Sequence, residues 1–92
     1  MSLGKRLYKS YAQLVAQEGA LVQAGEHVSK AMEEKNVSQK ELAKAIGKSP
    51  TTISRFLRGD GNIGLRTLSD MAFAFGYELD INFKPLDTGS ED

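Results

Sequence analysis

The chain has 92 residues, a length that allows one small domain and excludes a multi-domain enzyme. Hydrophobic residues make up 40% and charged residues 26%, as in a globular protein, while the lack of cysteine and the single histidine exclude a disulfide framework and a multi-histidine or thiolate metal site. Basic and acidic residues number 12 each, and the resulting net charge of zero, taken alone, argues against a nucleic-acid-binding protein.

The charge is distributed unevenly along the chain. Residues 1–34 are neutral, residues 35–66 carry seven basic against two acidic residues, and residues 67–92 carry one basic against six acidic residues. The middle third could attract a polyanion while the acidic end limits non-specific binding. A chance asymmetry on a solvated surface is the alternative.

The N-terminal third of the chain is helix-prone. No proline occurs between Leu7 and Lys35, and apolar residues recur there at the helical period on one face. The members of this face are Leu7, Tyr11, Leu14, Leu21, Val28 and Met32. Gly19 and Gly25 weaken the pattern, so one long helix and two helices that break near these glycines are both compatible with it.

Residues 38–47 carry the start and stop signals of a short helix. Ser38 and, three residues later, Glu41 predict a capping box, in which each side chain accepts a hydrogen bond from the other residue's backbone N–H. Gly47 predicts the end, because the left-handed position after a helix favours glycine. The apolar residues that share one side of this helix are Leu42, Ala43 and Ile46.

A second short helix is expected after a tight turn. Ser49 is a favourable N-cap and Pro50 a favourable first residue, so this helix should run to about Arg58 and end at the loop 59–61. Its inner face is formed by Ile53, Phe56 and Leu57. Its outer face is entirely polar and is formed by Thr51, Ser54, Arg55 and Arg58.

A further core helix is expected in residues 65–76. Apolar residues recur there at spacings of three and four, and Gly76 predicts the end of the helix. The residues of this face are Leu65, Leu68, Met71, Ala72 and Phe75.

The pattern then changes to the two-residue period of a β-strand. From Tyr77 to Lys84 apolar and polar residues alternate, and Pro85 ends the run. A lone strand leaves its backbone unpaired, so we expect it to pair antiparallel with the same strand of a second copy. The dimer contacts would be Tyr77, Leu79, Ile81 and Phe83. An extended tail lying over the chain's own helices is the alternative.

The run from Ser38 to Gly59 resembles the helix-turn-helix of the lambda repressor and Cro type, the XRE family. Members have a glutamine near the start of the first helix, a small residue where the helices meet, a glycine in the turn and a branched apolar residue in the second helix. The matching residues are Gln39, Ala43, Gly47 and Ile53. The resemblance covers roughly residues 28–76 and implies an all-α domain of four or five helices that binds double-stranded DNA.

The resemblance also implies roles for individual residues. The helix that begins at Pro50 would enter the major groove, where Arg55 would read a base, most simply guanine, and Thr51 would contact a thymine methyl group or a nearby acceptor. A solvated arginine is the alternative for Arg55. Contacts to backbone phosphates would come from Gln39, Lys48, Ser49, Thr52 and Arg58. Pro50 departs from the family pattern, because relatives often carry a base-reading side chain there and proline has no donor.

The chain divides into four expected parts: an N-terminal helical extension (1–25), a helix-turn-helix domain (26–76), a C-terminal strand (77–85) and a flexible acidic tail (86–92). Together they predict a dimeric transcription regulator, acting as a repressor on a near-palindromic operator. One alternative is an antitoxin-like regulator, since antitoxins of the HigA type look similar and the extension could bind a partner toxin. Another is a helix-turn-helix that has lost DNA binding.

Enzyme activity is not expected. His27 stands in an ordinary helical segment with no nucleophile motif, and the glycines of the loop 59–64 lack the lysine and hydroxyl residue of a phosphate-binding loop. We therefore expect no cofactor and no metal. No apolar run approaches the roughly 20 residues of a membrane span, and the N-terminus lacks the apolar core of a secretory signal, so a cytoplasmic protein without a membrane partner is expected.

Overall fold

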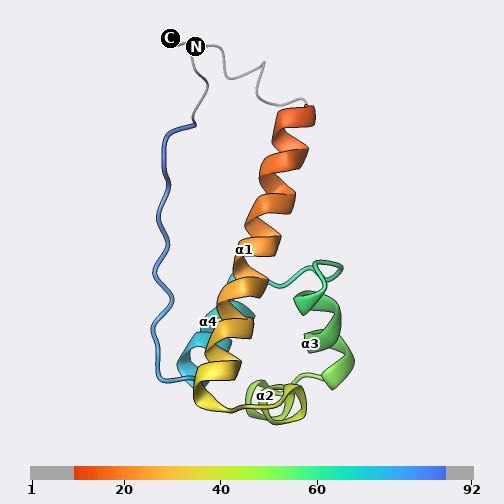
Figure 1. Cartoon of the computed structure of the whole chain (residues 1–92), viewed down its shortest axis with the longest axis vertical. Helices are drawn as coiled ribbons and strands as arrows, with labels where there is room; N and C mark the ends of the chain where they lie inside the picture. The colour runs from red at the N-terminus through yellow and green to blue at the C-terminus, as the bar shows by residue number, and fades with distance from the viewer. Residues whose placement is uncertain (1–9, 87–92) are drawn as a thin grey trace.

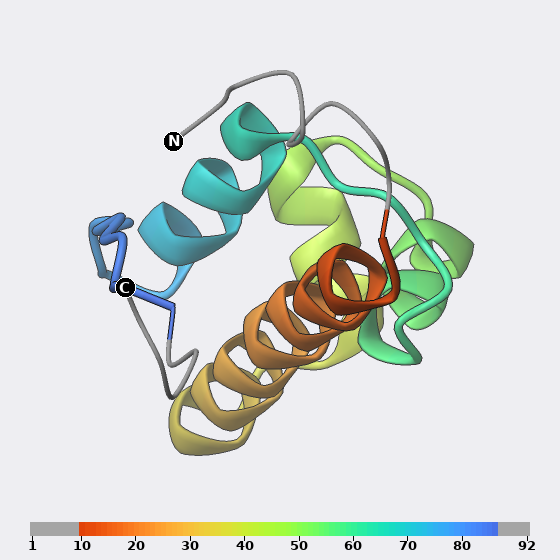
Figure 2. The same ribbon diagram turned by 90° about the horizontal axis from the view of Figure 1, so that it is seen from above.

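A computed structural model describes residues 10–86, and within this range four helices surround one apolar core (Figure 1). The helices are α1 (Tyr11–Lys35), α2 (Gln39–Ile46), α3 (Pro50–Leu57) and α4 (Leu65–Ala74). Their order and positions confirm the expected all-α class. The loop 58–64 between α3 and α4 crosses beside α1 (Figure 2).

Helix α1 is one continuous helix, so the alternative with a break near the glycines is wrong. It begins at a capping box in which Ser10 Oγ accepts a hydrogen bond from the backbone N–H of Gln13 at 3.1 Å. Gly19 is exposed and has no neighbour where a Cβ would stand, so the helix passes through it without a packing demand. Asn36 ends the helix in the left-handed conformation, at φ 56°.

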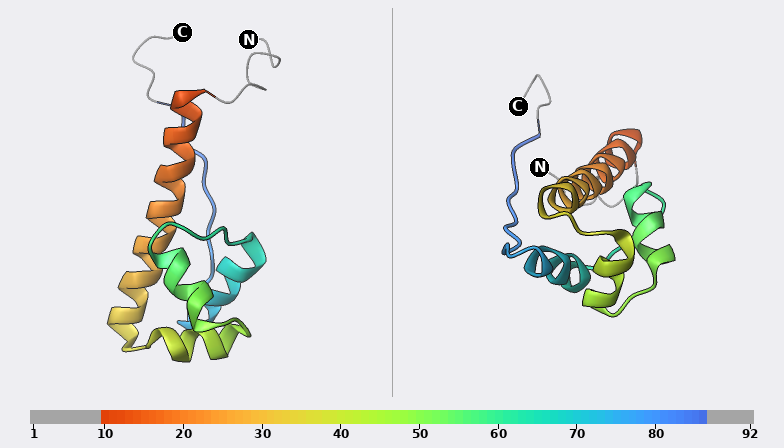
Figure 3. Two further views of the ribbon diagram at one scale, coloured as in Figure 1. Left: turned by 90° about the vertical axis from the view of Figure 1, so that its right-hand side faces the viewer. Right: turned by 60° about the horizontal axis from the view of Figure 1, so that its bottom comes forward.

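The N-terminal half of α1 projects beyond the rest of the domain (Figure 3, left). A helix of 25 residues is about 37 Å long, whereas the molecule measures 46 × 22 × 19 Å. Gly25, Val28 and Ala31 are buried, but residues 10–20 are all exposed. The apolar face expected for the whole helix is therefore covered only toward its C-terminal end, and Tyr11 and Leu14 lie in solvent.

The core lies where the C-terminal half of α1 meets the three shorter helices. Among the described residues, eight hydrophobic side chains are buried: Val28, Ala31, Leu42, Ala43, Ile53, Phe56, Met71 and Phe75. At Gly25 α1 packs closely against α3, and a Cβ there would make ordinary van der Waals contacts with the backbone oxygens of Phe56 and Leu57 at 3.6 and 3.7 Å. Leu65, expected in the core, is 64% exposed; it stands at the first position of α4 and lines a surface hollow with Leu79 and Ile81.

The expected C-terminal strand is not formed in the single chain. Gly76 turns the chain out of α4 at φ 87°, and the backbone N–H of Tyr77 donates to the carbonyl of Ala72 at 2.8 Å. From there the segment 77–86 runs extended, alongside α1 and opposite to it in direction (Figures 1 and 3). No β-ladder involves any of residues 10–86, because within this range the segment meets no second extended segment. Residues 87–92, most of the expected acidic tail, lie outside the described residues.

Candidate nucleic-acid interface

Helix α2 begins as the sequence predicts. Ser38 and Glu41 form the capping box, with the Ser38 backbone N–H donating to Glu41 Oε1 at 2.8 Å and the Glu41 N–H donating to Ser38 Oγ at 3.0 Å. The bond from the Ser38 backbone holds the pKa of the Glu41 carboxyl below its usual value, since it favours the charged form. The same carboxylate sits in the first turn, where the helix dipole favours negative charge.

The turn between α2 and α3 depends on a glycine. Gly47 adopts φ 70° and ψ 33°, a left-handed conformation that costs glycine little and other residues more. The backbone N–H of Lys48 then donates to the carbonyl of Ala43 at 2.9 Å. Only Lys48 and Ser49 separate this glycine from the first residue of α3, so the two helices are joined by a tight turn.

The two helices cross through small and branched apolar residues. Ala43 on α2 is 1% exposed, and Leu42 and Ile53 are fully buried. The short side chain of Ala43 lets the backbones approach, and Ile53 then fixes the rotation of α3 about its own axis. Phe56 is buried on the same side of α3.

The start of α3 is held by side-chain hydrogen bonds. Ser49 is the N-cap, and its Oγ accepts from the backbone N–H of Thr52 at 3.2 Å. The two hydroxyl oxygens of Ser49 and Thr52 also lie 3.0 Å apart. Pro50 occupies the first turn, where no intrahelical partner for its nitrogen is needed.

The residues expected to contact DNA fall into two groups. Lys48, Ser49, Thr51 and Thr52 lie together at the N-terminal end of α3, with Arg55 one turn further along. All of these are exposed except Thr52, which is half-buried. The second group stands elsewhere: Gln39, at the start of α2, lines a shallow hollow with Leu57, and Arg58 is the C-cap of α3.

Arg55 and Arg58 differ in their surroundings. Arg58 donates from Nη1 to Ser54 Oγ at 3.0 Å, and its Nε lies 3.5 Å from Asp60 Oδ2 in an exposed ion pair. Neither interaction was predicted from the sequence. The spacing of four residues between Ser54 and Arg58 is a signal for the hydrogen bond between them. Within residues 10–86 the guanidinium of Arg55 has neither an ion-pair nor a side-chain hydrogen-bond partner.

The described residues show no metal site and no membrane-spanning helix. His27 is exposed on α1, and residues 10–86 contain no group of three or more His, Asp or Glu side chains placed to hold a metal ion. No helix in the described part of the chain combines the length and apolarity needed to cross a bilayer.

Two short helices crossing at Ala43, joined by a left-handed glycine, with a buried inner face and a polar outer face on the second helix, define a helix-turn-helix domain. A family model described as HTH_3, helix-turn-helix, matches residues 28–82, more than half of the chain. The chain belongs to this family, which is the lambda repressor and XRE type. Its members are DNA-binding transcription regulators and are not typically enzymes, so this chain carries the DNA-binding domain of such a regulator. No curated protein and no solved structure gives a significant match to the chain.

Proposed function

We propose that the protein is a sequence-specific repressor that binds a near-palindromic operator as a homodimer. The observation that carries this proposal is the division of α3 into two faces: Ile53 and Phe56 are buried, whereas Thr51 and Arg55 are exposed. A helix held in this way can enter the major groove without losing any contact to its own domain.

Arg55 is the base-reading residue in this proposal, and Thr51 assists it. The guanidinium of Arg55 has no ion-pair partner among residues 10–86, and such a group can donate two parallel hydrogen bonds to O6 and N7 of guanine. Thr51 lies one turn earlier on the same face, where its methyl group or hydroxyl meets the neighbouring base pair. Pro50 offers no donor at the head of α3, so base reading falls on these two side chains.

Contacts to phosphates fix the register of α3 on the duplex. The residues proposed for them are Gln39, Lys48, Ser49, Thr52 and Arg58. Ser49 and Thr52 are oriented before binding by their mutual hydrogen bond, so ordering them costs little on association. Arg58 is the weakest member, because its Asp60 partner competes with a phosphate for the same guanidinium.

Dimerisation would place two α3 helices about 34 Å apart, one turn of DNA. The segment that begins at Tyr77 supports this part of the proposal, because Ile81 and Phe83 are exposed apolar residues on a segment that pairs with no other strand among residues 10–86. Its dimer contacts are Tyr77, Leu79, Ile81 and Phe83.

Selection of bound duplexes from a random pool, at a stated salt concentration, tests the proposal. We expect an enriched palindrome whose half-sites are centred about 10 base pairs apart. A single enriched half-site would contradict the dimer. An absence of enrichment, with wild type and Arg55→Ala behaving alike, would contradict sequence-specific binding and favour a helix-turn-helix that has lost this function. Lys30→Ala, a charge removed from α1 on another face, is the matched control.

A second candidate, an antitoxin-like regulator that also binds a partner toxin, is favoured by α1. Its projecting half lies outside the residues matched by the family model and exposes Tyr11, Leu14, Val15 and Val22. Co-purification of the wild type with a small basic protein would support it. The double variant Tyr11→Gln with Val15→Gln should abolish this co-purification, whereas Arg55→Ala should retain it. Binding that survives the α1 substitutions would contradict it.

A further inference from the structure

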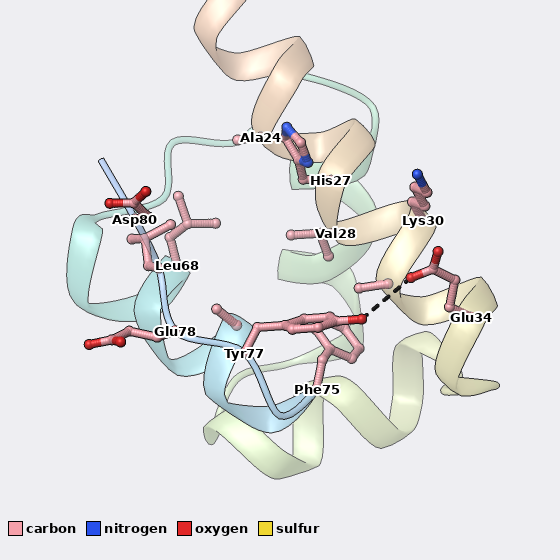
Figure 4. Close-up of a pocket in the computed structure, with 13 residues that line it drawn as sticks. Ala24, His27, Val28, Lys30, Glu34, Leu68, Phe75, Tyr77, Glu78 and Asp80 are labelled. Carbon is pink, nitrogen blue, oxygen red and sulfur yellow. Dashed lines mark hydrogen bonds between the residues drawn. The ribbon is translucent and has the colours of Figure 1, made fainter. Parts of the chain in front are cut away.

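The segment 77–86 is anchored at one end and unpaired beyond it. Tyr77 donates its backbone N–H to Ala72, and its hydroxyl donates to Glu34 Oε1 of α1 at 3.5 Å. Lys35 Nζ also lies 5.3 Å from the centre of the Tyr77 ring. Figure 4 shows Tyr77 directed toward α1 and Glu78 pointing away from it. Among the described residues, no backbone hydrogen bond involves residues 78–86, so both edges of the segment can accept another strand.

From Leu79 to Phe83 the apolar side chains of this segment become more exposed. Leu79 is half-buried and lines both the pocket of about 420 Å³ between α1 and α4 and a second hollow that contains Leu65. Ile81 is 55% exposed, and Phe83, at 98%, touches almost nothing in its own chain. A row of exposed alternate side chains on an unpaired edge is the kind of surface that a second strand covers.

Charge and proline limit how a second copy can pair with this segment. A two-fold axis between antiparallel strands places one residue opposite its own copy. With Asp80 on the axis, two carboxylates oppose each other, which is unfavourable. With Asn82 on the axis, each Asp80 opposes the second copy's Lys84, but Pro85 faces Leu79 inside the ladder, where its missing N–H removes a hydrogen bond whenever residues 79 and 85 form a hydrogen-bonded pair.

The register with Ile81 on the axis satisfies both limits. Each Glu78 then opposes the second copy's Lys84, so two opposite-charge pairs form. Each Leu79 opposes the second copy's Phe83 at the edge of the pocket between α1 and α4, and Pro85 falls at the end of the ladder, opposite Tyr77.

We propose that the dimer forms by antiparallel pairing of the two 77–85 segments, with the two-fold axis at Ile81. This inference rests on the proposed dimeric function and adds to it the register in which the two segments pair. In this register the polar face pairs Glu78 with Lys84 and Asp80 with the uncharged Asn82, so no two like charges oppose each other.

Single cysteines in the full-length chain test the register, because the protein has no cysteine of its own. Directly opposed residues lie within disulfide reach, whereas diagonal neighbours are roughly 7–8 Å apart. On oxidation we expect Ile81→Cys to give a covalent dimer at least several-fold faster than Asp80→Cys or Asn82→Cys. A mixture of these last two variants should cross-link with each other, since Asp80 opposes Asn82 in this register.

Other cross-linking patterns would overturn the inference in distinguishable ways. Fastest self-linking at Asp80→Cys or Asn82→Cys would establish a different register. Slow and equal linking at all three positions would show that this segment does not pair at all. A dimer that persists in that case, with its palindromic DNA preference, would leave the proposed function intact and move the interface to α1. Rapid linking at Ile81→Cys without any DNA preference would retain the register and refute the function.

A charge exchange tests the same register without cysteine. Glu78→Lys and Lys84→Glu should each raise the dimer dissociation constant about 2- to 30-fold at low salt, because two pairs become repulsive. The double variant should restore dimerisation to near the wild-type level. Sedimentation equilibrium without DNA measures this. Additive weakening in the double variant would contradict the Glu78–Lys84 pairing.

Discussion

The hydroxyl oxygen of Ser49 lies 3.0 Å from that of Thr52, and it also accepts the Thr52 backbone N–H at 3.2 Å. These two bonds close the first turn of α3, while Ile53 anchors the inner side of the helix in the core. Because both the start and the rotation of α3 are fixed, the direction in which Arg55 leaves the helix is fixed before DNA is bound.

Replacing Arg55 by alanine should weaken binding to the preferred duplex by about 1–3 kcal/mol and flatten the preference at one base pair. The physical reason is the loss of a bidentate contact to a base edge. Binding titrations on preferred and scrambled duplexes measure it, with Lys30→Ala as control. An equal loss on both duplexes would show that Arg55 contacts phosphate rather than a base.

Replacing Lys48 by alanine should reduce the slope of log affinity against log salt by about 1 and leave base preference unchanged. A lysine that neutralises one phosphate releases about one counterion, and this release is lost with the charge. Affinity measured at four or more salt concentrations gives the slope. If the slope stays at the wild-type value, Lys48 makes no phosphate contact.

Glycine-to-alanine substitutions at two positions should have opposite effects. Gly25→Ala should stabilise the fold by about 0.5–1 kcal/mol, since a Cβ there makes only ordinary contacts in a helix interior. Gly47→Ala should destabilise it by about 1–2 kcal/mol, since alanine is strained at φ 70°. Urea unfolding of both variants measures the change in the free energy of unfolding. A loss of stability in both would show that a Cβ at position 25 does not fit between α1 and α3 without strain.

The capping box at Ser38 should make stability dependent on pH in the acid range. The pKa of Glu41 is lower in the folded chain than its ordinary value of 4.5, so its contribution is present above pH 4.5 and is lost as pH falls through the folded pKa. The stability difference between wild type and Glu41→Gln, which keeps a hydrogen-bond acceptor but no charge, should therefore shrink from pH 7 to pH 3. Chemical unfolding across this range checks it; a constant difference would mean that the carboxylate charge is irrelevant to the cap.

Ending the chain after Tyr77 should leave a folded monomer. All eight core residues precede this point, and Tyr77 retains the backbone bond to Ala72 that follows α4. Light scattering gives the mass in solution, and circular dichroism confirms that the helices remain. A dimer that survives this truncation would locate the interface on the projecting half of α1.

The parts of the site that could be predicted are those set by short-range patterns. The cap at Ser38, the turn at Gly47 and the exposed side of α3 follow from spacings of three to nine residues, and each is found where the pattern places it. The ion pair of Arg58 with Asp60 was not predicted, because it depends on how the loop after α3 folds back. The exposure of Leu65 was not predicted either. Its spacing matches the apolar face of α4, but the covered part of that face begins one turn later.

The sequence by itself determined the helix-turn-helix, the helix that follows it and the ends of these three helices, because caps, glycines and the helical period act between residues close in the chain; it left open whether the N-terminal third forms one helix or two. Only the tertiary structure decided which apolar residues are covered. A core formed by three short helices spans only part of a 25-residue helix, so half of α1 projects. The described part of the chain likewise offers the segment 77–86 no strand to pair with, so the backbone of residues 78–86 makes no hydrogen bond there, and the side chains of Ile81 and Phe83 remain exposed.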